Sequence, residues 1–138
     1  MDSKQLMLKA LPFLVLSVSA TPLAALQPLH EDPRVVAGFY WIGLADEVQE
    51  RCDSIEPRLF RAFGRIRSLE RYAREVGYTA EQIDELTDNK AEKERLRARI
   101  RADLAKRGAT PETPEGYCTV GREEIAKDSA AGRLLRAR

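Results

Sequence analysis

The chain has 138 residues, of which 33% are charged and 7% aromatic, and its 23 Lys and Arg residues nearly balance its 22 Asp and Glu residues. A chain of this length forms one modest domain and is too short for a large doubly wound sheet or barrel, which usually takes about 200 residues or more. Many charges and few aromatics favour a charge-laced helical protein over a strand-rich sandwich or a membrane-spanning bundle.

Residues 1–25 have the order of a secretory signal peptide. Lys4 and Lys9 precede an uncharged, mostly apolar run over 11–20, and small, turn-prone residues follow it. This run is shorter than the roughly 20 apolar residues that a membrane span needs. We therefore predict a signal peptide followed by a single helical domain over 26–138, which is periplasmic or secreted and has no stable membrane span after the leader is cleaved.

Two cleavage sites compete, one after Ala25 and one after Ala20, and no cysteine follows the apolar run to receive a lipid anchor. Removal of residues 1–25 leaves equal numbers of basic and acidic side chains, so the mature net charge is zero. A general nucleic-acid binder needs excess positive charge, and a membrane-surface binder needs a basic face. Neither class is favoured overall.

Cys52 and Cys118 are the two cysteines of the chain. In an oxidising compartment, a pair without a CxxC motif or a neighbouring histidine favours one structural disulfide. Closing such a long loop is worth about 4 kcal/mol in the chain-entropy description. The alternative is two free thiols with a redox or metal-binding role, which requires a lowered thiol pKa or further ligands. The single histidine, His30, lies in the N-terminal tail of the mature chain.

The first helix is predicted over 33–52. Asp32 can cap it, Pro33 suits its first position, and apolar residues recur at spacings of three and four. Because apolar residues surround most of this helix, one interpretation is a central core helix. The other is that Tyr40 and Trp41 form an exposed docking patch, since aromatic side chains are favoured anchors at interfaces.

The second helix is predicted to start at Pro57 and to stop at Gly77. Its predicted buried stripe consists of Leu59, Phe60, Phe63, Ile66, Leu69, Ala73 and Val76. The opposite face carries Arg58, Arg61, Arg65, Arg67, Arg71 and Arg74. Such a face is usually solvated and paired, here with the acidic residues of 81–88. The alternative is a site for an anion or an acidic partner, with Arg58, Arg61 and Arg65 as candidate contacts.

Two further helices are predicted in the middle of the chain. Thr79 and Gln82 form a capping box that starts the third helix. Asn89 repeats this signature, so we expect the chain to break near Asp88 and to start a fourth helix that ends at Gly108.

The last segment is predicted to be a helix capped by Thr113, just before a proline. Ser129 is expected to cap a final turn, and Ala130, Leu134 and Leu135 to close the far end of the core, with the last three residues frayed. The complete pattern predicts an all-α fold, a compact bundle of four to five helices with one disulfide.

The sequence contains no recognisable catalytic or ligand motif. A Ser, His and Asp triad would need His30, which lies just before the first helix. Gly-rich phosphate loops and metal-ligand spacings are both missing. Glu123 and Glu124 are adjacent and point about 100° apart on a helix, so they are not expected to converge for acid and base chemistry. We therefore expect no enzymatic activity, no cofactor and no metal.

Three segments carry a family resemblance: GYTAEQI at 77–83, YCTVGREEI at 117–125 and SAAGRLL at 129–135. With them, the chain resembles a domain-of-unknown-function family of small exported alphaproteobacterial proteins. The resemblance covers most of the chain after the leader. It implies an exported helical protein and carries no established activity or site. A looser likeness, without a shared motif, is to small periplasmic acid-stress chaperones, which are also helical with one disulfide.

The sequence thus favours a non-enzymatic accessory or binding protein of the cell envelope, with an envelope protein rather than a nucleic acid as its partner. Its candidate contacts are Tyr40 and Trp41, or the arginines of the second helix. The alternative is a periplasmic acid-stress chaperone. Acid would neutralise the many carboxylates, raise the net charge steeply and loosen the fold.

Overall fold

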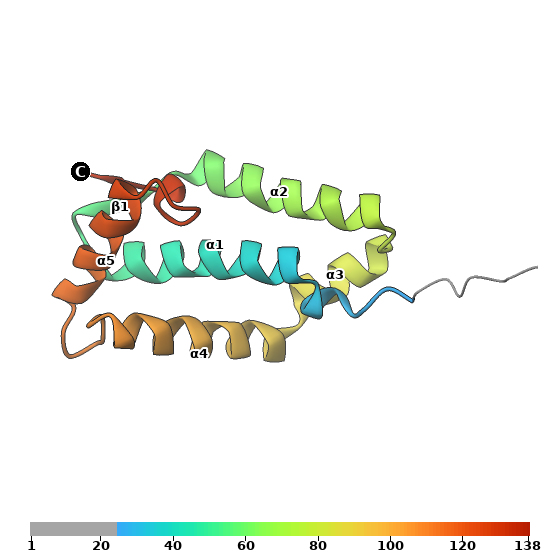
Figure 1. Cartoon of the computed structure of the whole chain (residues 1–138), viewed down its shortest axis with the longest axis horizontal. Helices are drawn as coiled ribbons and strands as arrows, with labels where there is room; N and C mark the ends of the chain where they lie inside the picture. The colour runs from blue at the N-terminus through green and yellow to red at the C-terminus, as the bar shows by residue number, and fades with distance from the viewer. Residues whose placement is uncertain (1–24) are drawn as a thin grey trace, which may run out of the picture.

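The structure, a computed structural model, describes residues 25–138 (Figure 1). Residues 1–24 of the predicted signal peptide, with the candidate cleavage site after Ala20, lie outside this described part, and the other candidate site follows its first residue, Ala25. The helices in chain order are η1 (Leu29–Glu31), α1 (Pro33–Arg51), α2 (Leu59–Val76), α3 (Ala80–Asp88), α4 (Lys90–Lys106), α5 (Glu115–Ala126) and η2 (Gly132–Leu134). Two short strands, β1 (Ile55–Pro57) and β2 (Leu135–Ala137), complete the described chain.

Helix α1 lies in the middle of the molecule, with α2 on one side and α4 on the other (Figure 1). Helix α3 connects these two outer helices at one end of α1, and α5 packs against the other end. The all-α prediction is therefore confirmed, because five α-helices form the described chain apart from one very small sheet.

Local sequence signals start and stop most of these helices. The Asp32 carboxylate accepts hydrogen bonds from the backbone N–H groups of Arg34 and Val35, both at 3.0 Å. Thr79 forms the predicted capping box at the start of α3, and Asn89 caps α4. Gly77 ends α2 with a φ of 108°, a left-handed conformation that glycine adopts without a steric penalty.

The start of α2 differs from the prediction. Pro57 lies in strand β1 rather than in the first turn of a helix, and α2 begins at Leu59. The reason is a tertiary contact, because the Arg58 backbone N–H donates to the Leu134 carbonyl at 2.7 Å and keeps this segment extended. A proline at a strand edge has no N–H to lose from the ladder, so the strand tolerates it.

The C-terminal residues are paired rather than frayed. Strand β2 runs antiparallel to β1, with Ile55 opposite Ala137, and the Arg136 side chain is ion-paired with Glu56. The Ser129 hydroxyl accepts from the Gly132 N–H at 2.9 Å, which confirms the predicted cap.

Two predictions about the end of the chain need correction. Thr113 does not cap α5, because its hydroxyl donates to the Gly108 carbonyl at 3.0 Å inside the preceding loop. Pro114 occupies the N-cap position without a side-chain cap. Leu134 and Leu135 are buried as expected, but Ala131 rather than Ala130 is the alanine that joins them in the core.

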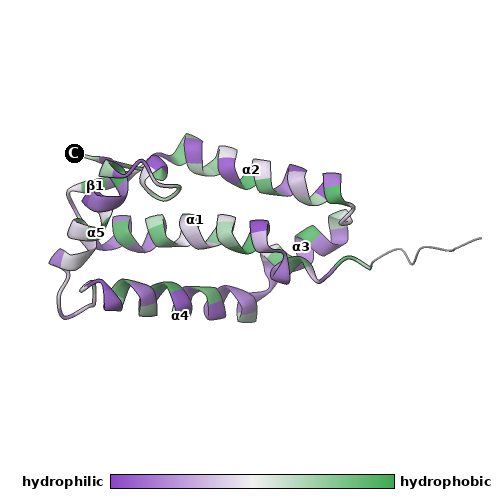
Figure 2. Cartoon of the chain, in the orientation of Figure 1, coloured by the Kyte–Doolittle hydropathy of each residue, from purple (hydrophilic) through white to green (hydrophobic). Residues whose placement is uncertain are grey.

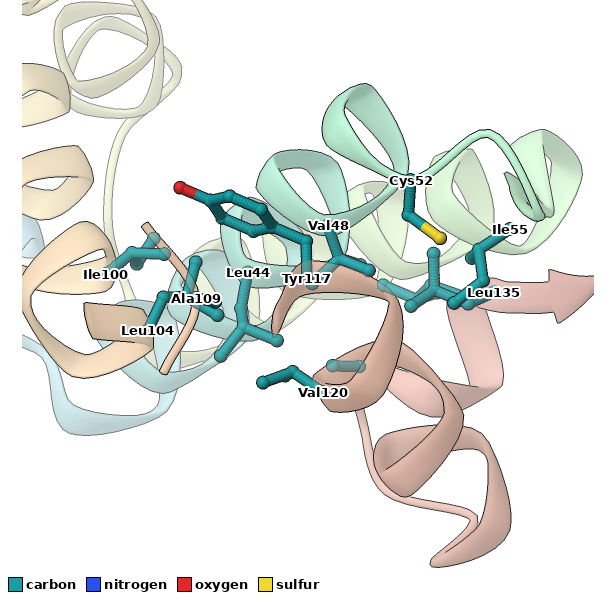
Figure 3. Close-up of a cluster of buried hydrophobic side chains, with 13 residues drawn as sticks. Leu44, Val48, Cys52, Ile55, Ile100, Leu104, Ala109, Tyr117, Val120 and Leu135 are labelled. Carbon is teal, nitrogen blue, oxygen red and sulfur yellow. The ribbon is translucent and has the colours of Figure 1, made fainter. Parts of the chain in front are cut away.

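Two apolar clusters form the core of the described chain. The main cluster joins the C-terminal half of α1 to α4, α5 and the chain end (Figure 3); its largest fully buried members are Leu44, Val48, Ile55, Ile100, Leu104, Val120 and Leu135. The second cluster, at the other end of α1, consists of Leu29, Val35, Ala73, Tyr78 and Ile83.

The predicted disulfide is confirmed. Cys52 and Cys118 are bonded, with their Cα atoms 5.1 Å apart and a separation of 66 residues in the sequence. Cys52 is buried in the main cluster, and Cys118 packs beside it on α5. The bond therefore fastens the end of α1 to α5 within the main apolar cluster of the described chain.

Candidate functional site

Apolar side chains at the N-terminal end of α2 face solvent. Leu69 and Ala73 are buried as predicted. The predicted stripe is wrong at its two ends, where the exposed fractions are 58% for Leu59, 94% for Phe60, 57% for Phe63 and 37% for Val76. Helix α2 forms an outer edge of the bundle, with α1 along one side, and it also contacts η2 and α3 (Figure 1). The apolar stripe is wider than the part of α2 that these neighbours cover.

Two arginines continue the same surface along α2. Phe60, Phe63, Arg67 and Arg71 follow one another at spacings of three and four, which places them on one side of the helix. The prediction that these two arginines lie on the face opposite the phenylalanines is therefore wrong. Both arginines are exposed, and neither forms an ion pair within residues 25–138. The predicted pairing with the acidic residues of 81–88 does not form. We call these four residues the aromatic–arginine face; in Figure 2 hydrophobic and hydrophilic segments alternate along α2.

An open pocket of about 380 Å³ adjoins this face. Its lining consists of Pro57, Arg58, Leu59, Phe60, Arg61 and Arg136. Arg58 Nε donates to the Leu135 carbonyl at 3.0 Å, and Arg61 Nη1 donates to the Arg133 carbonyl at 3.2 Å. These two arginines thus tie α2 to the chain end and also place positive charge beside Phe60.

The other predicted contact residues lie elsewhere. Tyr40 and Trp41 are half-buried against the main cluster, with their rings in a T-shaped arrangement 5.0 Å apart. Tyr40 Oη donates to Asp103 Oδ2 of α4 at 2.8 Å. Burial, followed by this hydrogen bond, raises the pKa of Tyr40 to about 12. These positions agree with the core-helix interpretation of α1, and a partner contact at these two residues stays a prediction.

Arg65, the third predicted arginine contact, is half-buried and forms no ion pair within the described residues. The structure therefore brings Arg58 and Arg61 together at the pocket and places Arg65 on a more covered side of α2. It separates all three from Tyr40, which contacts α4.

The buried carboxylate of Glu47 is ion-paired with arginines of α1 and α4. Glu47 is 3% exposed and lies 2.5 Å from Arg51 Nη1 and 3.1 Å from Arg101 Nε. The hydrogen bond and the negative charge of Glu47 raise the pKa of Arg101 despite its partial desolvation. Arg97 Nε lies 3.8 Å from the same carboxylate, so Glu47 of α1 is held by two arginines of α4 and joins the two helices.

Glu123 and Glu124 share a single partner. Arg107 Nη2 lies 2.9 Å from Glu123 and 2.8 Å from Glu124. The hydrogen bond that Arg107 donates to Glu123 lowers the pKa of the Glu123 carboxyl. The two acids thus meet at one guanidinium and not at a common reacting atom. Within residues 25–138, no group of three or more His, Cys, Asp and Glu side chains is placed to hold a metal ion.

Sequence reasoning missed the exposed aromatics because periodicity alone cannot say how many neighbours a helix has. One signal was present in Gly64, between Phe63 and Arg65. A Cβ added at Gly64 would meet no atom within 4 Å, so this part of α2 faces open space. A glycine inside an exposed helix costs stability, which marks the segment as one that is not optimised for packing.

The fold and this surface define an all-α, disulfide-linked protein with an exposed aromatic–arginine face. No helix within residues 25–138 has both the length and the apolar character to cross a membrane. The chain belongs to a family of unknown function (DUF5333), whose model matches residues 27–136. No curated protein and no solved structure matches the chain.

Proposed function

We propose that this protein is an exported, non-catalytic binding protein of the cell envelope, and that its aromatic–arginine face docks on an acidic surface of a partner protein. One observation carries the proposal. Phe60 is 94% exposed beside Phe63, and Arg67 and Arg71 on the same side of α2 have no ion-pair partner in the described chain.

The exposed rings favour association. Burying a phenylalanine side chain contributes about 1.5–3 kcal/mol, and Phe60 and Phe63 both have most of their surface left to bury. Aromatic residues and arginine are enriched at protein interfaces. An arginine without an internal partner can hold a carboxylate through two parallel hydrogen bonds. Together these properties suit a partner with an apolar socket rimmed by Asp and Glu.

A protein partner suits this face better than a lipid surface or a nucleic acid. Glu70 and Glu75 lie on the same helix, and the chain after residue 25 carries as many acids as bases. An anionic bilayer or a phosphate backbone attracts proteins through an excess of positive charge. A protein interface needs only local complementarity, which the aromatic–arginine face supplies.

Export is supported by three features. Disulfides such as Cys52–Cys118 persist mainly in oxidising compartments. The sequence of residues 1–25 has the order of a signal peptide. The family match starts at residue 27, directly after that segment. Fractionation of the native host should recover the protein in the periplasm or medium with the disulfide formed, and recovery from the cytosol with free thiols would refute export.

Docking is tested by site-specific photo-crosslinking in the native host. A benzophenone amino acid in place of Phe60 should give one discrete crosslinked species, and the same probe in place of Ala98, an exposed residue of α4, should not. Adding Arg67→Glu and Arg71→Glu should abolish the species. Crosslinks at both positions, or binding of the purified protein to anionic vesicles through Phe60, would contradict a protein partner.

A second candidate function is acid-stress chaperone activity, which is favoured by carboxylates that hold helices together. The pKa values of Asp103 and Glu123 are lowered by hydrogen bonds from Tyr40 and Arg107 respectively, so acid breaks contacts between helices. Prevention of client aggregation at low pH but not at neutral pH would support this candidate. Equal prevention at both pH values, lost on Phe60→Ser, would instead favour the aromatic–arginine face.

A further inference from the structure

A groove of about 420 Å³ opens between α1, α2, α3 and α4, and no residue of the aromatic–arginine face lines it. Its apolar lining consists of Val35, Val36, Phe39, Ile66, Leu86 and Leu96. Val35 is buried, and the other five are half-buried. The groove therefore presents a continuous set of apolar side chains that the described fold leaves partly uncovered.

The groove lies where the two core clusters part. Phe39 and Leu86 pack against the second cluster, at one end of α1, whereas Leu96 packs against the main cluster at the other end. Helices α2 and α4 lie on opposite sides of α1 (Figure 1), and the groove is lined by Ile66 of α2 and Leu96 of α4 as well as by residues of α1. Binding of an apolar molecule that displaces water from such a concavity is favourable, because it removes apolar surface from water.

The mouth of the groove is basic. Lys93, Arg95 and Arg99 line it from α4, together with one carboxylate, Glu92, which is ion-paired with Arg95. Lys93 and Arg99 form no ion pair within residues 25–138. The Arg99 guanidinium lies over the Tyr40 ring, 5.0 Å from its centroid, which holds the charge in place.

We propose that this groove binds one single-chain amphipathic anion, such as a fatty acid, with its chain on the apolar lining and its acid group at Lys93 and Arg99. The volume lies within the range of about 300–1,000 Å³ that small-molecule sites occupy. All three rim cations belong to α4, so the charge lies along one edge of an apolar floor. This arrangement is complementary to a molecule with one anionic end. The proposal is independent of docking through α2.

The test compares ligands of equal chain length. Decanoate and 1-decanol are titrated into the disulfide-bonded protein by isothermal titration calorimetry, below the concentrations at which either aggregates. We expect one site and about tenfold or more tighter binding of decanoate, since charge-assisted hydrogen bonds form only with the acid. A third titration with decanoyl lysophosphatidylglycerol distinguishes the source of the anion, because tighter binding of this ligand assigns a phosphate headgroup within the same class.

Rim variants locate the site. Lys93→Glu with Arg99→Glu should weaken decanoate binding about tenfold or more and leave decanol binding unchanged. The matched control, Arg122→Glu with Lys127→Glu, makes the same change of net charge at exposed positions in and after α5 and should alter neither affinity. All four side chains are exposed, so these variants should fold.

A groove variant tests the apolar part. Val36→Phe adds volume to the lining and should weaken both ligands; where circular dichroism shows that it does not fold, the rim variants decide. Equal affinities for decanoate and decanol, no saturable binding of decanoate, or decanoate binding that is unaffected by the rim charges would each overturn the proposal.

Discussion

Tyr40 Oη donates a hydrogen bond to Asp103 Oδ2 across 2.8 Å and so joins the central helix α1 to α4. This bond, followed by one from Lys106, lowers the pKa of the Asp103 carboxyl. A carboxyl whose folded-state pKa is lowered contributes stability above its unfolded pKa, about 3.9 for Asp, and loses that contribution as the pH falls through the folded-state value. The contact is therefore sensitive to acid and insensitive to pH near neutrality.

We predict that Asp103→Asn reduces the loss of stability between about pH 5 and pH 2, because the amide does not titrate. Urea denaturation at a series of pH values measures this. Asp53→Asn, at an exposed position after α1, is the control and should retain the wild-type pH dependence. The same slope in the Asp103 variant and the wild type would show that this carboxyl does not couple folding to pH.

The bond between Cys52 and Cys118 should be a major contributor to stability. We predict that replacing both cysteines by alanine lowers the free energy of unfolding by about 2–5 kcal/mol, because the unfolded chain regains the freedom of a 66-residue loop. Reductant should destabilise the wild type by a similar amount and leave the variant unchanged. A variant as stable as the oxidised wild type would contradict the prediction.

Short-range chemistry explains the parts of the fold that the sequence predicted correctly. The caps at Asp32, Thr79 and Asn89 and the stop at Gly77 depend on groups within a few residues of each other. The pairing of Ile55 with Ala137 depends on residues far apart in the chain, so no local pattern announces it.

The candidate site was predicted only in part, for a related reason. The sequence indicated Arg58, Arg61 and Arg65 as candidate contacts, but it placed Arg67 and Arg71 on the face opposite the phenylalanines. The apolar stripe of Phe60 and Phe63 looked buried because helical periodicity reveals which side chains share a face but not whether another element covers that face. Exposure at α2 follows from its place at the edge of the bundle, which is a property of the tertiary arrangement (Figure 1).

The buried carboxylate of Glu47 should matter more than an exposed one on the neighbouring helix. Glu47→Gln should cost about 1.5–3 kcal/mol, since it removes charge-assisted hydrogen bonds to Arg51 and Arg101. Glu94→Gln breaks the pair of two exposed side chains, Glu94 and Arg97, and should cost less than about 0.5 kcal/mol. Chemical denaturation of both variants provides the comparison, and equal costs would show that burial does not strengthen the Glu47 contacts.

Two glycines should respond in opposite directions to the same substitution. A Cβ on Gly132 would lie 1.9 Å from the Glu124 carbonyl oxygen, so Gly132→Ala should destabilise the fold by about 1–3 kcal/mol. Gly64→Ala adds a Cβ in open space inside α2 and should stabilise by about 0.5–1 kcal/mol. Thermal unfolding measures both, and destabilisation at Gly64 would argue against the exposure of this side of α2.

The aromatic–arginine face should be dispensable for folding. Replacing Phe60 and Phe63 together by serine should change the free energy of unfolding by less than about 1 kcal/mol, because most of both rings already faces water. Leu69→Ala, on the buried side of the same helix, should cost about 2–5 kcal/mol. The two variants are compared by urea denaturation, with circular dichroism to verify helix content. A large cost at the two phenylalanines would show that they pack internally, and the docking proposal would then lose the observation on which it depends.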